Sequence, residues 1–237
     1  MYTNYQSNDG FGAQFQHIIQ TYIFCKLNNK RFLYRPLEKV EHNYSGDAGF
    51  NGKLENLMNL KNNIENDIHN LASPLHHICR WFEDNIEICC DCEHMAFIKQ
   101  CFWKNKDRDY FKNGKINIAV HIRRENPDDR GAAGQRITTP DRYYLEIMNK
   151  IRNEHKDQNI VFHIYSQSYN SNFIGYKAPD VELHIDENIV DTFIGLVAAD
   201  ILVTSPSSFS YVAALISDGK IYYKSFWHKP RQNWIIG

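Results

Sequence analysis

The stretch that decides the fold is INIAVHIRREN, which runs from Ile116 to Asn126. Its first half is short, apolar and rich in β-branched residues, and it follows the turn pair Asn113-Gly114, so it predicts a buried strand. The arginines Arg123 and Arg124 come directly after this strand. Guanidinium groups bind anions, so the end of the strand is predicted to meet an anionic ligand.

From Ile116 onward the sequence alternates between strands and helices, which predicts an α/β domain with a parallel sheet covered on both faces. Helices are predicted to begin at Asp141, where Asp141 or Thr139 would cap the free amides, and over Asn188–Ala199 and Phe209–Ile216. The predicted strands are Ile116–Ile122, Ile160–Tyr165, Val181–Ile185, Ile201–Thr204 and Lys220–Tyr223. Ligands of such sheets bind at the carboxyl ends of the strands.

The chain before Lys112 has mainly helical periodicity, so we predict two domains, residues 1–112 and 113–237. Apolar residues recur at helical spacing between Phe15 and Leu27, and a strand is predicted over Arg31–Tyr34. Further helical patterns cover Leu54–Leu71 and Met95–Trp103.

Composition indicates a globular protein, with 43% apolar and 14% aromatic residues in a chain of 237. The net charge of -1 argues against nucleic-acid binding. Without a signal peptide pattern or a membrane-spanning run, the chain as given is expected to be soluble and cytoplasmic. The spacing of Cys89, Cys90, Cys92 and His94 does not match a zinc site, so reduced thiols and no bound metal are expected.

Polar groups follow four of the predicted strands and should share one edge of the sheet: Arg123 and Arg124, Ser166 and Gln167, Asp186, and Ser205–Ser208. Guanidinium forks, hydroxyls and the amides of a helix beginning near Ser208 suit a phosphate or diphosphate. An equally weighted alternative is that the two arginines pair on the surface with Glu125, Asp128 and Asp129.

Three motifs together resemble the fucosyltransferase superfamily that makes α-1,2, α-1,6 and protein O-fucosyl linkages. HIRR at His121–Arg124 resembles its His-x-Arg-Arg motif, SPSSFS at Ser205–Ser210 its Ser-Ser-Phe motif, and DGFGAQF at Asp9–Phe15 its N-terminal glycine loop. The resemblance implies a GT-B architecture, in which two Rossmann-like domains face each other across a cleft. It implies that residues 1–112 are the acceptor side and that residues 113–237 bind the nucleotide sugar. It also implies GDP-fucose as donor, inversion at the anomeric carbon and no metal ion or other cofactor.

The resemblance also implies roles for individual residues. Arg123 would hold the leaving diphosphate, Asp191 would read the guanine, and Asp9 would be the catalytic base. Asp129 is the second choice for the base if Asp9 is not the base. The remaining candidate bases are Glu125, Asp128 and Glu187. The remaining expected contacts of the nucleotide sugar are His121, Ser207, Ser208, Phe209, Gly10 and Gly12. A structural role is expected for Asp200.

The predicted function is therefore the transfer of fucose from GDP-fucose to an oligosaccharide or glycoprotein acceptor by an inverting, metal-independent glycosyltransferase. One alternative keeps the fold but uses another donor, with xylose, galactose or rhamnose linked to UDP or GDP. A second alternative, from a different class, is a catalytically inactive module that binds a nucleotide or a glycan.

Overall fold

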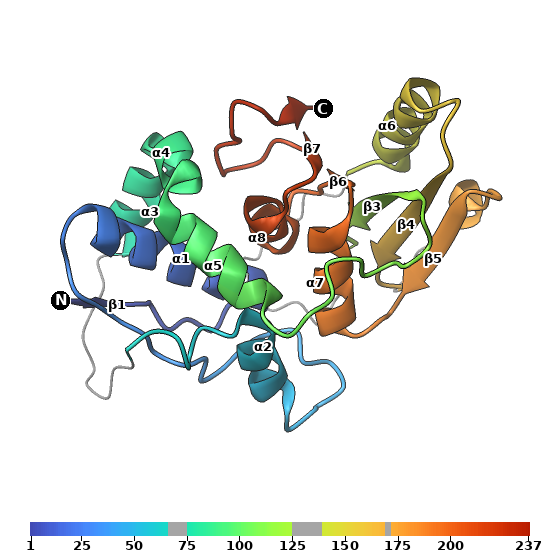
Figure 1. Ribbon diagram of the computed structural model, residues 1–237. Coiled ribbons are helices and arrows are strands. Elements are labelled where there is room, and N and C mark those ends of the chain that lie inside the picture. Colours follow the sequence, from blue (N-terminus) through green and yellow to red (C-terminus); the bar gives the residue numbers. More distant parts are fainter. Residues whose placement is uncertain (66–74, 125–138, 169–171) are drawn as a thin grey trace. The chain divides into compact units, whose positions relative to one another are not determined.

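The computed structural model describes residues 1–65, 75–124, 139–168 and 172–237 (Figure 1). The chain forms two compact units, Met1–Asp107 and Arg108–Gly237. The division falls close to the boundary predicted between residues 112 and 113, while the acceptor and nucleotide roles of the two units stay predictions. Within the described ranges no helix combines the length and the apolar character that crossing a membrane requires.

In its described residues, the first unit combines a small parallel sheet with five helices. The strands are β1 (Tyr2–Thr3) and β2 (Phe32–Leu33), and the helices are α1 (Phe11–Leu27), α2 (Phe50–Met58), α3 (Leu75–Asp84), α4 (Ile86–Asp91) and α5 (Glu93–Trp103). The periodic residues of α1 are buried except Leu27, which is half-buried, and this helix contacts α3 and α5. The predicted helix is therefore confirmed, but its burial extends beyond one apolar face, because Gln16, Gln20 and Thr21 are buried as well.

The helix predicted over Leu54–Leu71 was wrong in its bounds. It begins at Phe50 and ends at Met58, because Asn59 adopts the left-handed conformation with φ 54° and ψ 37°. Asparagine tolerates this conformation at the end of a helix better than most residues do. The end of the predicted range, beyond residue 65, lies outside the described residues.

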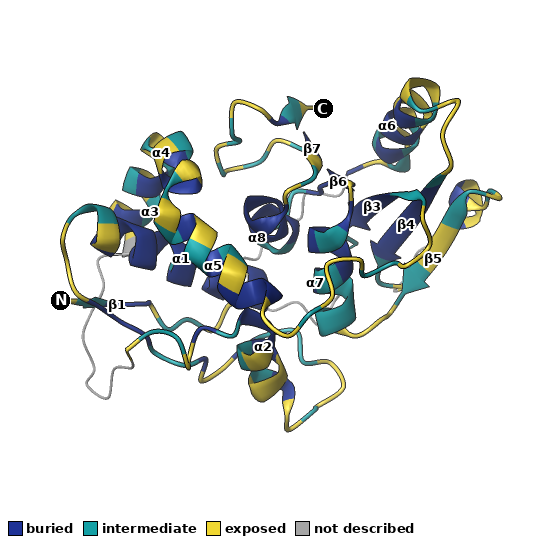
Figure 2. Ribbon diagram, in the orientation of Figure 1, coloured by how far each residue is buried: buried dark blue, intermediate teal, exposed yellow. Residues whose placement is uncertain are grey.

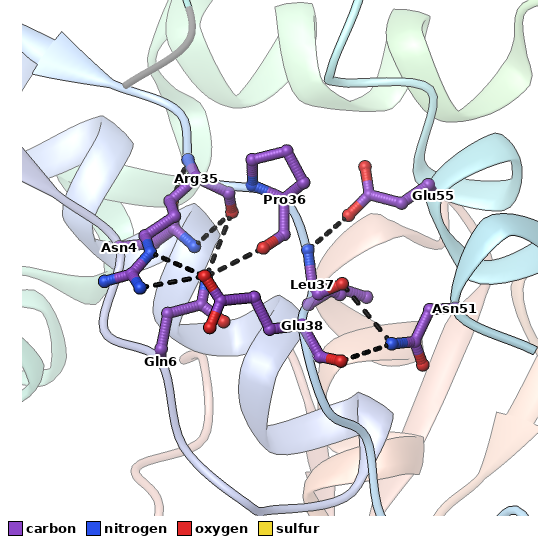
Figure 3. A network of polar contacts seen from close by, with 8 residues as sticks. All are labelled: Asn4, Gln6, Arg35, Pro36, Leu37, Glu38, Asn51 and Glu55. Atoms are coloured by element: carbon purple, nitrogen blue, oxygen red, sulfur yellow. Dashed lines mark hydrogen bonds and ion pairs between the residues drawn. The ribbon is translucent and has the colours of Figure 1, made fainter. Parts of the chain in front are cut away.

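A polar network fastens the segment that follows β2 (Figure 3). The Asn4 side chain donates to the Arg35 carbonyl and accepts from the Arg35 N–H, both at 2.8 Å. From α2, the Glu55 carboxylate accepts the Leu37 N–H at 2.7 Å, and the Asn51 amide donates to the Glu38 carbonyl at 2.8 Å. The backbone at the carboxyl edge of the small sheet is thus held from two sides.

The second unit is an α/β domain with a six-stranded sheet in the order β5-β4-β3-β6-β7-β8, and every neighbouring pair is parallel. Its strands are β3 (Ile116–Ile122), β4 (Ile160–Ser166), β5 (Val181–Ile185), β6 (Ile201–Val203), β7 (Lys220–Tyr223) and β8 (Ile235–Ile236), and its helices are α6 (Asp141–Glu154), η1 (Ile174–Tyr176), α7 (Ile189–Ala198) and α8 (Ser208–Ile216). This arrangement is compatible with a Rossmann-like fold and confirms the predicted parallel sheet.

Helices cover both faces of this sheet. Figure 1 places α6 on one face and α7 with α8 on the other, and Figure 2 shows β3 and β4 as buried. Successive strand residues point to opposite faces. Ile118 and Val120 accordingly pack in the core with Tyr144 of α6. Asn117 and His121 have the opposite parity and point to the face of α7 and α8.

Candidate functional site

The tip of β3 is joined to the loop after β6 by a buried hydrogen bond. The Nδ1 atom of His121 lies 2.8 Å from the Ser205 hydroxyl, and neither residue is appreciably exposed. The His121 ring also packs 5.5 Å from the ring of Phe209 at the start of α8. These contacts bring the HIRR and SPSSFS motifs together, and we call residues 121–124, 166–167 and 205–208 the strand-end rim.

His121 contributes no positive charge to this rim near neutral pH. Burial, and secondarily the neighbouring Arg123 guanidinium, lowers the pKa of His121 to about 3. The neutral ring therefore holds the Ser205 loop in place. The nucleotide contact expected for His121 stays a prediction.

Arg123 projects from the carboxyl end of β3 and is half-buried. Its Nη1 atom donates to the side-chain oxygen of Gln167, which follows β4, at 3.3 Å. The Ser166 hydroxyl donates to the Ile122 carbonyl at 2.7 Å and ties the same two strand ends together. The bond to Gln167 therefore orients the guanidinium of Arg123.

Arg124 has a structural environment instead. It forms an ion pair with Asp141, and the Tyr176 hydroxyl donates to the same carboxylate oxygen at 2.7 Å. Only 11% of the Arg124 side chain is exposed, and its guanidinium lies 5.5 Å from the centre of the Phe173 ring. The alternative partners Glu125, Asp128 and Asp129 lie outside the described residues. The ion pair with Asp141 nevertheless gives Arg124 a structural role that Arg123 does not share.

The predicted cap of α6 was wrong. Pro140 occupies the N-cap position of α6, and no side chain makes a capping hydrogen bond there. Asp141 is the first residue of the helix, and its carboxylate is bound to Arg124 and Tyr176. These long-range partners replace the local one that the sequence suggested.

The N-terminus of α8 adds backbone donors to the rim. The Ser207 hydroxyl accepts the Phe209 N–H at 3.3 Å, and the Ser210 hydroxyl bonds to both the N–H and the carbonyl of Ser205. The loop is therefore fixed by its own hydrogen bonds. The first-turn amides of a helix carry a partial positive charge, and α8 begins just after the carboxyl end of β6, so these amides suit an anion at this edge.

The acidic residues that follow β5 already have partners within the chain. Asp191 lies in the first turn of α7 and bonds through its carboxylate to Asn188, the N-cap of this helix. Glu187 accepts from His184 Nδ1 at 2.7 Å, and Asp186 accepts the Ser168 N–H at 2.9 Å. Asp200 accepts the Asn117 N–H at 2.8 Å, as its expected structural role requires. Guanine recognition by Asp191 stays a prediction.

The predicted residues of the glycine loop belong to the first unit. Asp9 is exposed, while its backbone carbonyl accepts from Gln14 Nε2 at 2.7 Å and from the Glu41 N–H at 3.2 Å. Gly10 is the N-cap of α1, and Gly12 is buried within this helix. A Cβ atom at Gly10 would lie 2.5 Å from Cδ2 of His42. The His42 ring therefore already occupies the space that the absent side chain of Gly10 leaves open.

No protein-family model matches the chain, and a search of curated proteins finds no match.

Asp129, the second choice for the base, lies outside the described residues. Sequence reasoning missed Asp141 and Tyr176 as partners of Arg124, because no local pattern links them. It also gave no role to His163, Glu182 and His184, which the structure brings together on β4 and β5.

Proposed function

We propose that this protein is an inverting, metal-independent glycosyltransferase that transfers fucose from GDP-fucose to an oligosaccharide or glycoprotein acceptor. A GT-B arrangement of the two units, with the donor held by the second unit, is part of this proposal. The observation that carries it is the contact between His121 and Ser205, because this contact joins the Arg123 strand end to the N-terminus of α8. A guanidinium group and helix amides on one rim suit a diphosphate.

The proposed reaction is a single in-line displacement. The acceptor oxygen forms a bond to the anomeric carbon of fucose, and the bond from that carbon to the β-phosphate oxygen breaks. GDP leaves with the electron pair, while the acceptor proton passes to a carboxylate base. Negative charge therefore grows on the diphosphate, where Arg123 and the first-turn amides of α8 would stabilise it.

Preorganisation supports the proposed role of Arg123. Gln167 holds the guanidinium, and Ser207 and Ser210 fix the loop that precedes α8. Donors that are already oriented do not need to rearrange as charge develops, and this is the main source of electrostatic catalysis. Ser208 and Phe209 at the start of the helix are proposed to contact the nucleotide sugar, and Asp191 to read the guanine.

Asp9 is proposed to be the base. Its carboxylate is exposed, and its backbone is anchored by Gln14 and Glu41, so the side chain extends from a fixed loop. Gln14 also donates to the Lys39 carbonyl at 2.7 Å, which ties the loop to the segment after β2. A base must be held within reach of the acceptor hydroxyl, and an anchored loop fulfils the first part of that requirement.

The proposal is tested by titrating the protein with GDP and UDP and by measuring hydrolysis of and transfer from a panel of GDP- and UDP-sugars. We expect preferential binding of GDP, hydrolysis of GDP-fucose, and transfer to a fucose acceptor with inverted configuration. Preference for UDP or for another sugar would replace the donor assignment. Tight nucleotide binding with no turnover of any donor would identify a binding module instead.

A further inference from the structure

A cluster of two histidines and one glutamate occupies the edge of the large sheet formed by β4 and β5. His163 Nδ1 lies 2.9 Å from His184 Nε2 and 3.4 Å from Glu182 Oε2, and the last two atoms are 4.0 Å apart. Glu182 is the register partner of His163 across the two parallel strands, and His184 follows two residues later. All three side chains therefore share the face opposite α6.

The hydrogen bonds of Asn117 determine which nitrogen of His163 carries the proton. The Asn117 amide nitrogen donates to the Lys115 carbonyl at 2.9 Å, and its oxygen accepts from Asn113 Nδ2 at 2.8 Å. His163 Nε2 faces that same oxygen at 3.0 Å and must donate to it. In the neutral ring, Nδ1 of His163 then carries a lone pair that points at His184 and Glu182.

The second ring is oriented in the same manner. His184 Nδ1 faces the Glu187 carboxylate at 2.7 Å, and a carboxylate accepts hydrogen bonds, so this nitrogen carries the proton. Its Nε2 therefore also presents a lone pair in the neutral ring. The two nitrogens that carry these lone pairs and the Glu182 carboxylate oxygen lie within 4.0 Å of one another, which is a set of groups that suits a cation.

We propose that His163, Glu182 and His184 form a binding site for a divalent transition-metal ion, with Zn²⁺ as the ion of choice. Imidazole and carboxylate groups are ligands that zinc prefers, and ligand atoms on one tetrahedral zinc lie roughly 3.3 Å apart. The distances of 2.9, 3.4 and 4.0 Å bracket this value. Three protein ligands leave a fourth position for water.

Outer contacts hold both rings in this orientation. The Phe111 ring stacks on His163 with a centroid distance of 4.2 Å, and Tyr165 stacks on His184 at 4.6 Å. A histidine ligand whose second nitrogen donates to a carboxylate, as His184 does to Glu187, is the usual outer arrangement of a metal site. The ligands are thus positioned before any ion binds.

This site is separate from the strand-end rim and does not rest on the proposed function. His163 lies in the middle of β4, while the rim begins at its end, so an ion here would join the edge strand β5 to β4. The competing cation is a proton, which would make His184 an imidazolium that donates to both His163 and Glu187. The two cations are distinguished by direct metal titration.

The test is a titration of the full chain with Zn²⁺ by calorimetry and with Co²⁺ by visible absorption. We expect one tightly bound ion per chain, with cobalt bands that lack thiolate charge-transfer absorption. Thiolate absorption would instead assign the ion to cysteines such as Cys89 and Cys92 and overturn the proposal. Failure to bind either ion above the level of a His184→Ala variant would leave the proton as the cation and overturn it as well.

Variants separate ligands from supporting residues. His184→Ala and Glu182→Gln each remove one ligand and should weaken Zn²⁺ binding strongly, and Glu182 is exposed, so its variant is expected to fold. Glu187→Gln leaves all three ligands and should weaken binding by about 10- to 100-fold. His155→Gln, at the C-terminal end of α6, is the matched control and should bind as the parent does. Equal binding by all four variants would contradict the site.

Discussion

The two units end their parallel strands in different ways. After β1 and β2 the polar groups bind the backbone of neighbouring segments, as Asn4 does to Arg35 and Gln14 to Lys39. After β3, β4 and β6, bonds to the backbone such as that of Ser166 with Ile122 are joined by bonds between side chains, as in the pairs of His121 with Ser205 and of Arg123 with Gln167. The first edge uses these hydrogen bonds to fasten backbone segments, whereas the second also brings a guanidinium group and helix amides to one rim.

This difference leads us to expect the chemistry of the first unit to depend on one exposed side chain. Asp9→Asn should abolish transfer, because the neutral amide cannot take the acceptor proton, while GDP binding stays within a few-fold of the parent. The measurement is transfer from GDP-fucose alongside calorimetric titration with GDP. Glu93→Gln, at a carboxylate whose side chain is 88% exposed, is the control. Full transfer activity in the Asp9→Asn variant would show that Asp9 is not the base and would indicate Asp129 instead.

The second edge should depend on the guanidinium at the tip of β3. Arg123→Ala should lower the turnover of GDP-fucose by about 100-fold or more, since a preorganised donor to the leaving diphosphate is lost. Arg142→Ala, at an 87% exposed arginine on α6, should leave turnover unchanged. Turnover within a few-fold of the parent in the Arg123→Ala variant would remove Arg123 from the site. Rescue of the rate by free guanidinium would strengthen the assignment.

The two edges also differ in how far the sequence could predict them. Short apolar runs separated by helical stretches located β3, β4, β5, β6 and β7, and the carboxyl-end rule then grouped the rim residues correctly. Side-chain partners distant in sequence could not be predicted, because they depend on tertiary packing. Arg124 binds Asp141 at the start of α6, and His163 meets His184 only because β4 and β5 are adjacent. The alternation of Glu182 and His184 on one strand was the available signal for the last contact.

The first unit was harder to predict for a local reason. Strand β2 lies within the predicted range Arg31–Tyr34, but β1 has only two residues, too short for a period-two pattern to show. Helices α3 and α4 follow one another almost without interruption, and no helix was predicted over either of them. The motif of the glycine loop was visible in the sequence, but the contact of Gly10 with His42 was not.

Lowering the pH should reduce the unfolding free energy of the protein through His121 at the strand-end rim. Its pKa is lowered from the ordinary value of 6.5 to about 3, so folding favours the neutral ring. The stability that the neutral His121 ring contributes is fully present above the pKa of His121 in the unfolded chain. It is lost as the pH falls toward about 3, at up to about 1.4 kcal/mol per pH unit. The unfolding free energy of a His121→Asn variant should therefore fall less steeply between about pH 6 and pH 4. Parallel curves for parent and variant would show that folding does not lower the pKa of His121.

Gly10 allows a test of whether the first edge serves the fold or a ligand. Gly10→Ala should destabilise the protein by about 1 kcal/mol, because the new Cβ would overlap the His42 ring, which is half-buried and must turn away. Truncation of that ring in the double variant Gly10→Ala/His42→Ala should restore most of the stability, as followed by denaturant unfolding. If transfer activity returns with stability, Gly10 serves packing alone. If stability returns without activity, the space above Gly10 is needed by the substrate.

The smallest expected effects distinguish the two helix N-termini of the second unit. Asn188 caps α7 by accepting from the N–H groups of Val190 at 3.1 Å and Asp191 at 2.9 Å, whereas Ser207 caps α8 through one bond of 3.3 Å. Replacement of either cap by alanine should lower the unfolding free energy by about 1 kcal/mol, with the larger loss at Asn188. GDP should reverse part of the destabilisation in Ser207→Ala, because a diphosphate bound at α8 would satisfy the amide that the cap had satisfied. An equal shift of both variants by GDP would place the diphosphate away from the N-terminus of α8.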